Sequence, residues 1–220
     1  MPEEQKSEST LRRLAIYGGS FSPPHKGHIA AARAFYSAVL PDKMLIMPAR
    51  IPPHKKLDSG ASDRDRLEMC RLAFEDDAFL AGHAEVSDYE LHADRVSYTC
   101  YTLRHFAKTA EQLWLLIGTD MLLTFEEWKN YREVFRRAWI CFAERRTETP
   151  EHRAETDAAI ARYRERYGAR IERLVYDPVE VSSTDLRETL RTGADCGTLL
   201  PESVRRYIIQ NGLYGVKNDG

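Results

Sequence analysis

The sequence has only four cysteines, and none lies close enough to another to suggest a metal site. Cys70, Cys100, Cys141 and Cys196 have no CxxC spacing, which argues against zinc binding and leads us to expect reduced thiols in a cytoplasmic protein. No secretory signal and no apolar run of about 20 residues is present, so neither export nor membrane insertion is expected. The net charge of -2 excludes a strongly basic surface of the kind that attracts nucleic acid.

Two common nucleotide-binding signatures are also missing. The chain contains neither GxGxxG nor GxxxxGK[ST], so a dinucleotide fingerprint and a phosphate loop lose support. Its hydrophobic fraction of 43% and charged fraction of 30% are those of an ordinary globular protein. At 220 residues we expect one folded domain over residues 13–215, preceded by a flexible extension over residues 1–12.

Short apolar runs alternate with amphipathic stretches from Leu11 onwards. This alternation predicts an α/β fold, a Rossmann-like open parallel sheet with helices on both faces and a small helical part at the C-terminus. The predicted strands cover residues 14–17, 44–47, 84–87, 113–117, 139–142 and 171–176. The predicted helices cover residues 29–40, 64–74, 98–107, 151–167, 186–191 and 202–210.

The most informative segment is residues 18–28, GGSFSPPHKGH, between the first predicted strand and the first predicted helix. A helix that begins there presents unpaired backbone N–H groups and its positive dipole end to phosphate. Gly18 and Gly19 allow a ligand to approach the backbone closely. His25 and His28 are three residues apart, so both imidazoles can face one phosphate group. Taken singly, each residue fits a tight turn or an ordinary histidine equally well.

A second phosphate-binding helix start is predicted at residues 181–187, VSSTDLR, after the last predicted strand. Its donors are the hydroxyls of Ser182, Ser183 and Thr184 and the guanidinium of Arg187. The alternative is plain helix capping, because Asp185 and Glu188 fit a capping box.

The first segment resembles the HxGH signature of the nucleotidyltransferase superfamily, and its full form is similar to that of the bacterial nicotinate-nucleotide adenylyltransferases. Further matches follow in the family's order, and together they extend the resemblance over residues 14–214. They are PPHK at 52–55, SYTxxTL at 97–103, GxD at 118–120, Trp128, and SSTxxR at 182–187. One departure is Ser22, where the family usually has Asp.

The resemblance implies that the domain over residues 13–215 transfers the adenylyl group of ATP to nicotinate mononucleotide, releasing pyrophosphate in NAD biosynthesis. It implies catalytic roles for His25, His28 and Arg187, with Lys55 close to the reacting phosphates. The implied ATP-binding residues are Gly18, Gly19, Ser20, Phe21, Gly118, Asp120, Ser182, Ser183 and Thr184. The implied acceptor-binding residues are His54, Lys55, Tyr98, Thr99 and Trp128. Mg²⁺ is expected on the phosphates of ATP, because the sequence shows no carboxylate cage.

Two other interpretations stay open. One is the same chemistry with another acceptor, such as phosphopantetheine, or a cytidylyl transfer. The other is a non-catalytic nucleotide-binding regulator, which Ser22 alone encourages. The expected partners are ATP and nicotinate mononucleotide, with neither nucleic acid nor a membrane. The sequence leaves the oligomeric state undecided, a homo-oligomer included.

Overall fold

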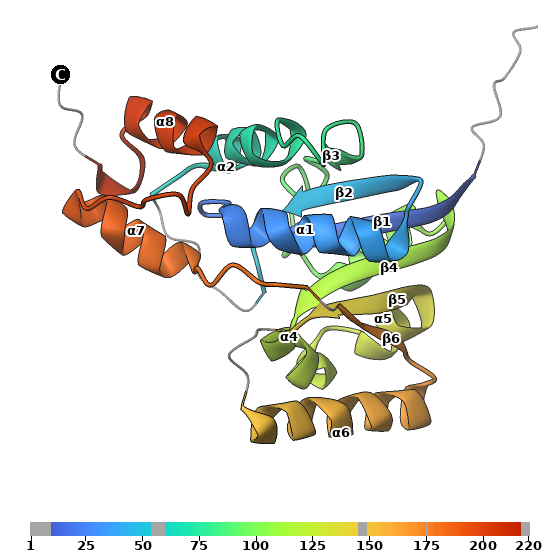
Figure 1. Ribbon diagram of the computed structural model, residues 1–220. Helices are drawn as coiled ribbons and strands as arrows, with labels where there is room; N and C mark the ends of the chain where they lie inside the picture. The colour runs from blue at the N-terminus through green and yellow to red at the C-terminus, as the bar shows by residue number, and fades with distance from the viewer. Residues whose placement is uncertain (1–9, 54–59, 145–148, 175, 217–220) are drawn as a thin grey trace, which may run out of the picture.

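A computed structural model of the chain describes residues 10–53, 60–144, 149–174 and 176–216 (Figure 1). Its centre is a parallel sheet of six strands in the order β3-β2-β1-β4-β5-β6. The strands are β1 (Leu11–Gly19), β2 (Lys43–Pro48), β3 (Ala84–Val86), β4 (Ala110–Gly118), β5 (Ala138–Ala143) and β6 (Arg170–Leu174). The chain progresses outwards from β1 on one side and from β4 on the other, so the strand order reverses between these two strands.

The central strands are apolar on both faces, because each face carries its own core. Side chains alternate across a strand, so Leu14 and Ile16 of β1 join one core cluster while Ala15, between them, joins the other. All three are buried. This two-sided burial explains the continuous apolar runs of β1 and β4, as expected for a parallel sheet.

Helices cover both faces of the sheet. One cluster contains residues of α1 (Lys26–Val39), α2 (Asp63–Cys70), α7 (Ser183–Thr192) and α8 (Glu202–Gln210). The other contains residues of α3 (Thr99–Phe106), α4 (Thr119–Leu123), α5 (Tyr131–Arg137) and α6 (Pro150–Tyr167). In Figure 1, α2 and α8 lie above the sheet and α6 lies below it. The predicted fold class is therefore confirmed.

Several element boundaries differ from those predicted. β1 begins at Leu11, where Leu11 N donates to Thr109 O at 3.0 Å, so residues 11 and 12 belong to the sheet and not to an extension. The α-helix predicted over 64–74 covers Asp63–Cys70, and the chain then forms a π-helical turn over Arg71–Glu75. The last strand ends at Leu174 instead of residue 176.

The structure also adds elements that the sequence pattern did not predict. Between β4 and β5 lie α4, a short 3₁₀ turn (Phe125–Glu127) and α5. Each is too short to show a helical repeat of apolar residues, and all three are held by packing under the sheet. A further 3₁₀ turn (Leu213–Gly215) follows α8.

The four cysteines are all buried and unbridged. No helix in the described ranges combines the length and the apolar character that crossing a membrane requires.

Candidate nucleotide site

Buried side chains hold the loop that follows β1. Phe21 is buried and has a φ of 45°, and its ring packs edge-on against Phe74 at 5.5 Å between centroids. A Cβ on Gly19 would come within 2.9 Å of the Phe21 ring, so the absence of a side chain at Gly19 permits this packing. Arg66, only 1% exposed, donates from Nη1 to Ser20 O at 2.8 Å. The backbone from Gly19 to Phe21 is therefore rigid, while the Phe21 side chain belongs to the core.

His25 and His28 cap the amino end of α1 reciprocally. The His28 N–H donates to His25 Nδ1 at 3.4 Å, and the His25 N–H donates to His28 Nδ1 at 3.2 Å. The two rings stack with centroids 3.7 Å apart. Because each Nδ1 accepts a hydrogen bond, Nε2 is the ring nitrogen that carries the hydrogen in each neutral imidazole. The same contacts thus close the helix start and orient two N–H donors.

Burial changes the charge of His25. The residue is 5% exposed, and loss of solvation lowers its pKa from 6.5 to about 4. At neutral pH this imidazole is uncharged. Its expected contribution to phosphate binding is therefore a hydrogen bond from Nε2–H and not a full positive charge.

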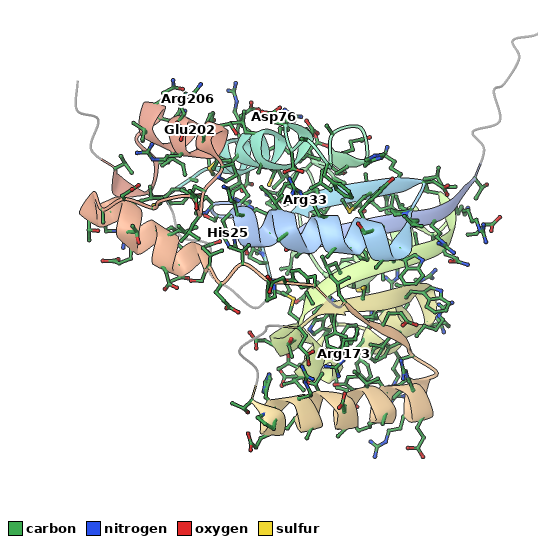
Figure 2. The ribbon with its side chains drawn as sticks, in the orientation of Figure 1. His25, Arg33, Asp76, Arg173, Glu202 and Arg206 are labelled. Atoms are coloured by element: carbon green, nitrogen blue, oxygen red, sulfur yellow. The ribbon has the colours of Figure 1, made fainter. Side chains whose placement is uncertain are left out.

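The two predicted phosphate-binding segments meet, although about 160 residues separate them. Ser183 Oγ donates to Pro23 O at 3.0 Å, and Arg187 Nη1 donates to Ser22 O at 2.8 Å. Figure 2 shows His25 at the amino end of α1, beside the segment that enters α7. The amino ends of α1 and α7 therefore face one shared region.

The start of α7 combines capping with phosphate-binding geometry. Ser182 caps the helix by accepting from the Asp185 N–H at 3.1 Å, so the predicted capping box on Asp185 and Glu188 is wrong and α7 begins at Ser183 instead of residue 186. Thr184 Oγ1 accepts from Arg187 Nη2 at 3.3 Å. A hydroxyl that accepts one hydrogen bond still donates its own hydrogen to a second group, so the capping role of Ser182 does not conflict with phosphate binding.

Gly118 and Asp120 lie next to this region across the switch in strand order. Gly118 ends β4 and Asp120 is an exposed residue in the first turn of α4. A Cβ on Gly118 would meet nothing described within 4 Å. β1 and β4 are parallel neighbours, and in open α/β sheets ligands bind beyond the carboxyl ends of the strands at such a switch in strand order.

Three of the predicted acceptor residues, Tyr98, Thr99 and Trp128, belong to segments that meet at the amino end of α3. Tyr98 is the N-cap of α3 and Thr99 its first residue, and no described side chain caps this end. Trp128 stacks on Phe125 at 4.5 Å, and its neighbour Lys129 places Nζ 4.7 Å from the centroid of the Tyr98 ring. The structure therefore brings the Trp128 segment to the start of α3, from which it is separated in sequence by a strand and a helix.

A buried carboxylate supports this helix start. Glu90 Oε1 accepts from Thr102 Oγ1 at 2.5 Å inside the protein. Burial raises the pKa of Glu90, and the opposing effect of the hydrogen bonds from Thr102 and Ser97 is smaller. The Ser97 hydroxyl also accepts from Arg50 N at 3.1 Å, so the segment before α3 is tied to the loop after β2.

Two of the predicted site residues, His54 and Lys55, lie outside the described residues. In the described ranges no group of three or more His, Cys, Asp and Glu side chains is arranged to hold a metal ion. The sequence motifs did not include Arg66 in the site, although its side chain holds the backbone of the loop after β1 at Ser20. They also gave no role to Tyr214, whose hydroxyl lies 3.1 Å from Ser22 Oγ. Neither contact leaves a periodic signal in the sequence.

Two helix starts and a pair of stacked histidines at the carboxyl end of an open parallel sheet define a nucleotide-binding α/β protein equipped for phosphoryl chemistry. A family model described as cytidylyltransferase-like matches residues 16–189.

The chain is 39% identical over 209 residues to a probable nicotinate-nucleotide adenylyltransferase of Gloeobacter violaceus, covering 93% of this chain and 97% of the relative. It is 32% identical to a protein of the same name from Lachnoclostridium phytofermentans, covering 93% and 100%. The chain therefore belongs to the cytidylyltransferase-like family, in the group of the nicotinate-nucleotide adenylyltransferases.

Solved structures share the fold at lower identity. The nicotinic acid mononucleotide adenylyltransferase of Plasmodium falciparum, complexed with NaAD, aligns with a TM-score of 0.76 at 16% identity over 94% of this chain and 98% of that chain. A putative nicotinate-nucleotide adenylyltransferase of Vibrio parahaemolyticus aligns with a TM-score of 0.61 at 20% identity, covering 94% and 97%. At these identities the likeness establishes the fold alone.

Proposed function

We propose that this chain transfers the adenylyl group of ATP to nicotinate mononucleotide, forming nicotinate adenine dinucleotide and pyrophosphate. The observation that carries the proposal is the junction of the α1 and α7 amino ends, where Arg187 contacts the loop that leads into the histidine pair. Two positive helix ends and a guanidinium at one place suit a triphosphate. Membership of the family supports the same reaction.

The reaction is an in-line displacement at the α-phosphorus. An oxygen of the acceptor's phosphate forms the new bond to phosphorus, the bond from that phosphorus to the oxygen bridging it to the β-phosphate breaks, and its electron pair leaves with pyrophosphate. The acceptor's phosphate is already ionised at neutral pH, so the protein needs no strong general base. Its tasks are to align the two phosphates and to stabilise charge on the leaving group.

Each phosphate-binding group has a distinct task in the proposal. His25 and His28 donate from Nε2 to the reacting phosphates, because their Nδ1 atoms are occupied by the cap. Arg187 and the hydroxyls at the start of α7 bind the β- and γ-phosphates, the future pyrophosphate. The planar guanidinium of Arg187 suits bidentate contact with phosphate oxygens, and its bonds to Ser22 O and Thr184 Oγ1 place it beside the loop before α1. The carboxylate of Asp120 accepts from the adenosine ribose.

The acceptor ring is assigned to the start of α3. Backbone N–H groups at this helix end, together with the Thr99 hydroxyl, suit the carboxylate of nicotinate better than the carboxamide of nicotinamide, since charge-assisted hydrogen bonds are about twice as strong as neutral ones. Trp128 stacks near the pyridine ring. We assign His54 and Lys55, by family resemblance alone, to the region near the phosphates.

Mg²⁺ is assigned to the phosphates of ATP and not to a cage on the protein. Among the described residues no three His, Cys, Asp or Glu side chains gather into a metal cage, and Mg²⁺ commonly binds through substrate phosphates and water, so we assign its entry to the substrate. We further propose that the predicted domain over residues 13–215, together with Leu11 and Arg12 at the start of β1, forms the catalytic unit. The four unbridged cysteines favour a reducing compartment, the cytoplasm.

The test is pyrophosphate release from ATP and Mg²⁺ with a panel of acceptors: nicotinate mononucleotide, nicotinamide mononucleotide, phosphopantetheine and no acceptor. We expect the highest kcat/KM with nicotinate mononucleotide and no release without an acceptor. ATP binding without turnover on any acceptor would instead establish the regulator interpretation. Preferential turnover of another acceptor would replace the assigned substrate.

A further inference from the structure

The C-terminal turn reaches back to the loop that follows β1. Tyr214, in the 3₁₀ turn Leu213–Gly215, is 3% exposed, and its hydroxyl lies 3.1 Å from the hydroxyl of Ser22, itself 3% exposed. The two residues are 192 positions apart. A hydrogen bond between two buried hydroxyls is a specific contact, because either group left alone would lose its water without replacement.

Both ends of Tyr214 are held. Its backbone N–H donates to Gly60 O at 3.0 Å, and a Cβ on Gly60 would come within 2.7 Å of the tyrosine ring. Its own backbone adopts a φ of 58°, and Phe21, next to Ser22, has a φ of 45°. These uncommon backbone angles persist only where surrounding contacts enforce them. The position of Tyr214 is therefore fixed by contacts other than the one with Ser22.

Ser22 is held at both of its polar groups. Arg187 Nη1 donates to the Ser22 carbonyl at 2.8 Å, and Tyr214 contacts the Ser22 hydroxyl. Ser22 lies three positions before His25, so its place sets where the chain enters α1. Burial raises the pKa of the Tyr214 hydroxyl to about 12, so the pair is neutral and adds no negative charge beside Arg187.

We infer that Tyr214 is a positioning residue for the ATP triphosphate: through Ser22 it holds the loop before α1 against Arg187, so that the histidine pair and the guanidinium address the same phosphates. This inference rests on the proposed function. The contact between Tyr214 and Ser22 does not involve the predicted acceptor residues at the start of α3 and in the Trp128 segment. The hydroxyl of Tyr214 therefore affects binding of ATP and not of the acceptor.

The experiment compares Tyr214→Phe, Ser22→Ala and the double variant. Tyr207→Phe is the matched control, because its hydroxyl also comes from the C-terminal part of the chain but donates to Asp65 Oδ1 of α2 at 3.0 Å and not to Ser22. Affinity for an α,β-methylene analogue of ATP is measured by calorimetry, together with kcat and both KM values. Melting temperatures and circular dichroism are recorded for every variant.

We expect either single change to weaken analogue binding and to lower kcat/KM for ATP by about 5- to 10-fold, the worth of one neutral hydrogen bond. KM for nicotinate mononucleotide should stay constant, and the double variant should be no worse than the single ones, since both remove one interaction. Tyr207→Phe should bind the analogue like the unmodified protein.

Three outcomes would overturn the inference: unchanged analogue affinity in Tyr214→Phe, additive losses in the double variant, or an equal loss in Tyr207→Phe. Unchanged affinity together with a lower melting temperature would show that the role of Tyr214 is structural only. Should Tyr214→Phe fold poorly, Ser22→Ala tests the same bond. Analogue binding needs no acceptor, so a coupled loss of affinity in a protein that does not turn over nicotinate mononucleotide would refute the proposed function while leaving the inference standing.

Discussion

Acid should destabilise this protein through His25. The imidazole is buried at the amino end of α1, and desolvation lowers its pKa from 6.5 to about 4. Between these two values the unfolded chain takes up a proton at this position and the folded chain does not. The free energy of unfolding therefore falls as the pH is lowered through this window and is independent of this group well above it.

The size of the effect follows from the shift. One pKa unit corresponds to about 1.4 kcal/mol, so His25 should cost the folded state about 2 kcal/mol at pH 5 and about 3 kcal/mol at pH 4. For a domain whose total stability is about 5 to 15 kcal/mol, this is a large fraction. The loss should begin above pH 6.5, since a histidine of the unfolded chain is already half protonated at that pH.

The matched variant is His25→Asn, because asparagine is a good N-cap residue and does not titrate. Urea unfolding of both proteins is followed from pH 7.5 to pH 4, and the difference between their unfolding free energies is plotted against pH. We expect the unmodified protein to lose about 3 kcal/mol relative to the variant over this range. A difference that does not change with pH would refute the assignment of a neutral, desolvated His25.

Further expectations concern the substrates. His28→Ala should lower kcat by about 10²- to 10³-fold with unchanged circular dichroism, and near-normal turnover would remove His28 from the catalytic residues. Arg187→Ala should weaken ATP use more than Arg187→Lys, because lysine keeps the charge but loses the planar fork; equal defects in kcat/KM would argue against bidentate contact. Trp128→Ala should lower kcat/KM for nicotinate and nicotinamide mononucleotide alike, whereas Thr99→Ala should narrow their ratio. The opposite pattern in the same assay would reverse the roles assigned to Trp128 and Thr99.

The strands were predictable where burial on both faces makes the pattern continuous. β4 and β5 stand out in the sequence because almost every residue of their central parts is apolar. The same reasoning missed α4 and α5, which have five and seven residues. Helices this short have no stability of their own, so only their packing against β4, β5 and α6 makes them helical.

The sequence predicted two separate phosphate-binding motifs, but it did not predict that they lie at one site. The glycine-histidine turn and the SSTDLR segment each suggested phosphate binding from local chemistry. That Ser183 contacts Pro23 is a property of the folded chain, since no local preference of either segment specifies the other. From the sequence alone Asp185 remained a candidate N-cap residue. The structure shows that Ser182 is the N-cap of α7.

Sequence by itself determined the elements whose causes are local: the apolar strands, the helix starts rich in hydroxyl and histidine side chains, and Gly168 ending α6 in the left-handed conformation that glycine adopts without strain. Tertiary structure alone decided the charge of His25, the grip of Arg66 on the Ser20 carbonyl and the contact of Tyr214 with Ser22. The physical reason is that desolvation and long-range hydrogen bonding depend on which distant segments exclude water from a group, and that is settled only when the sheet and its two helical layers pack together.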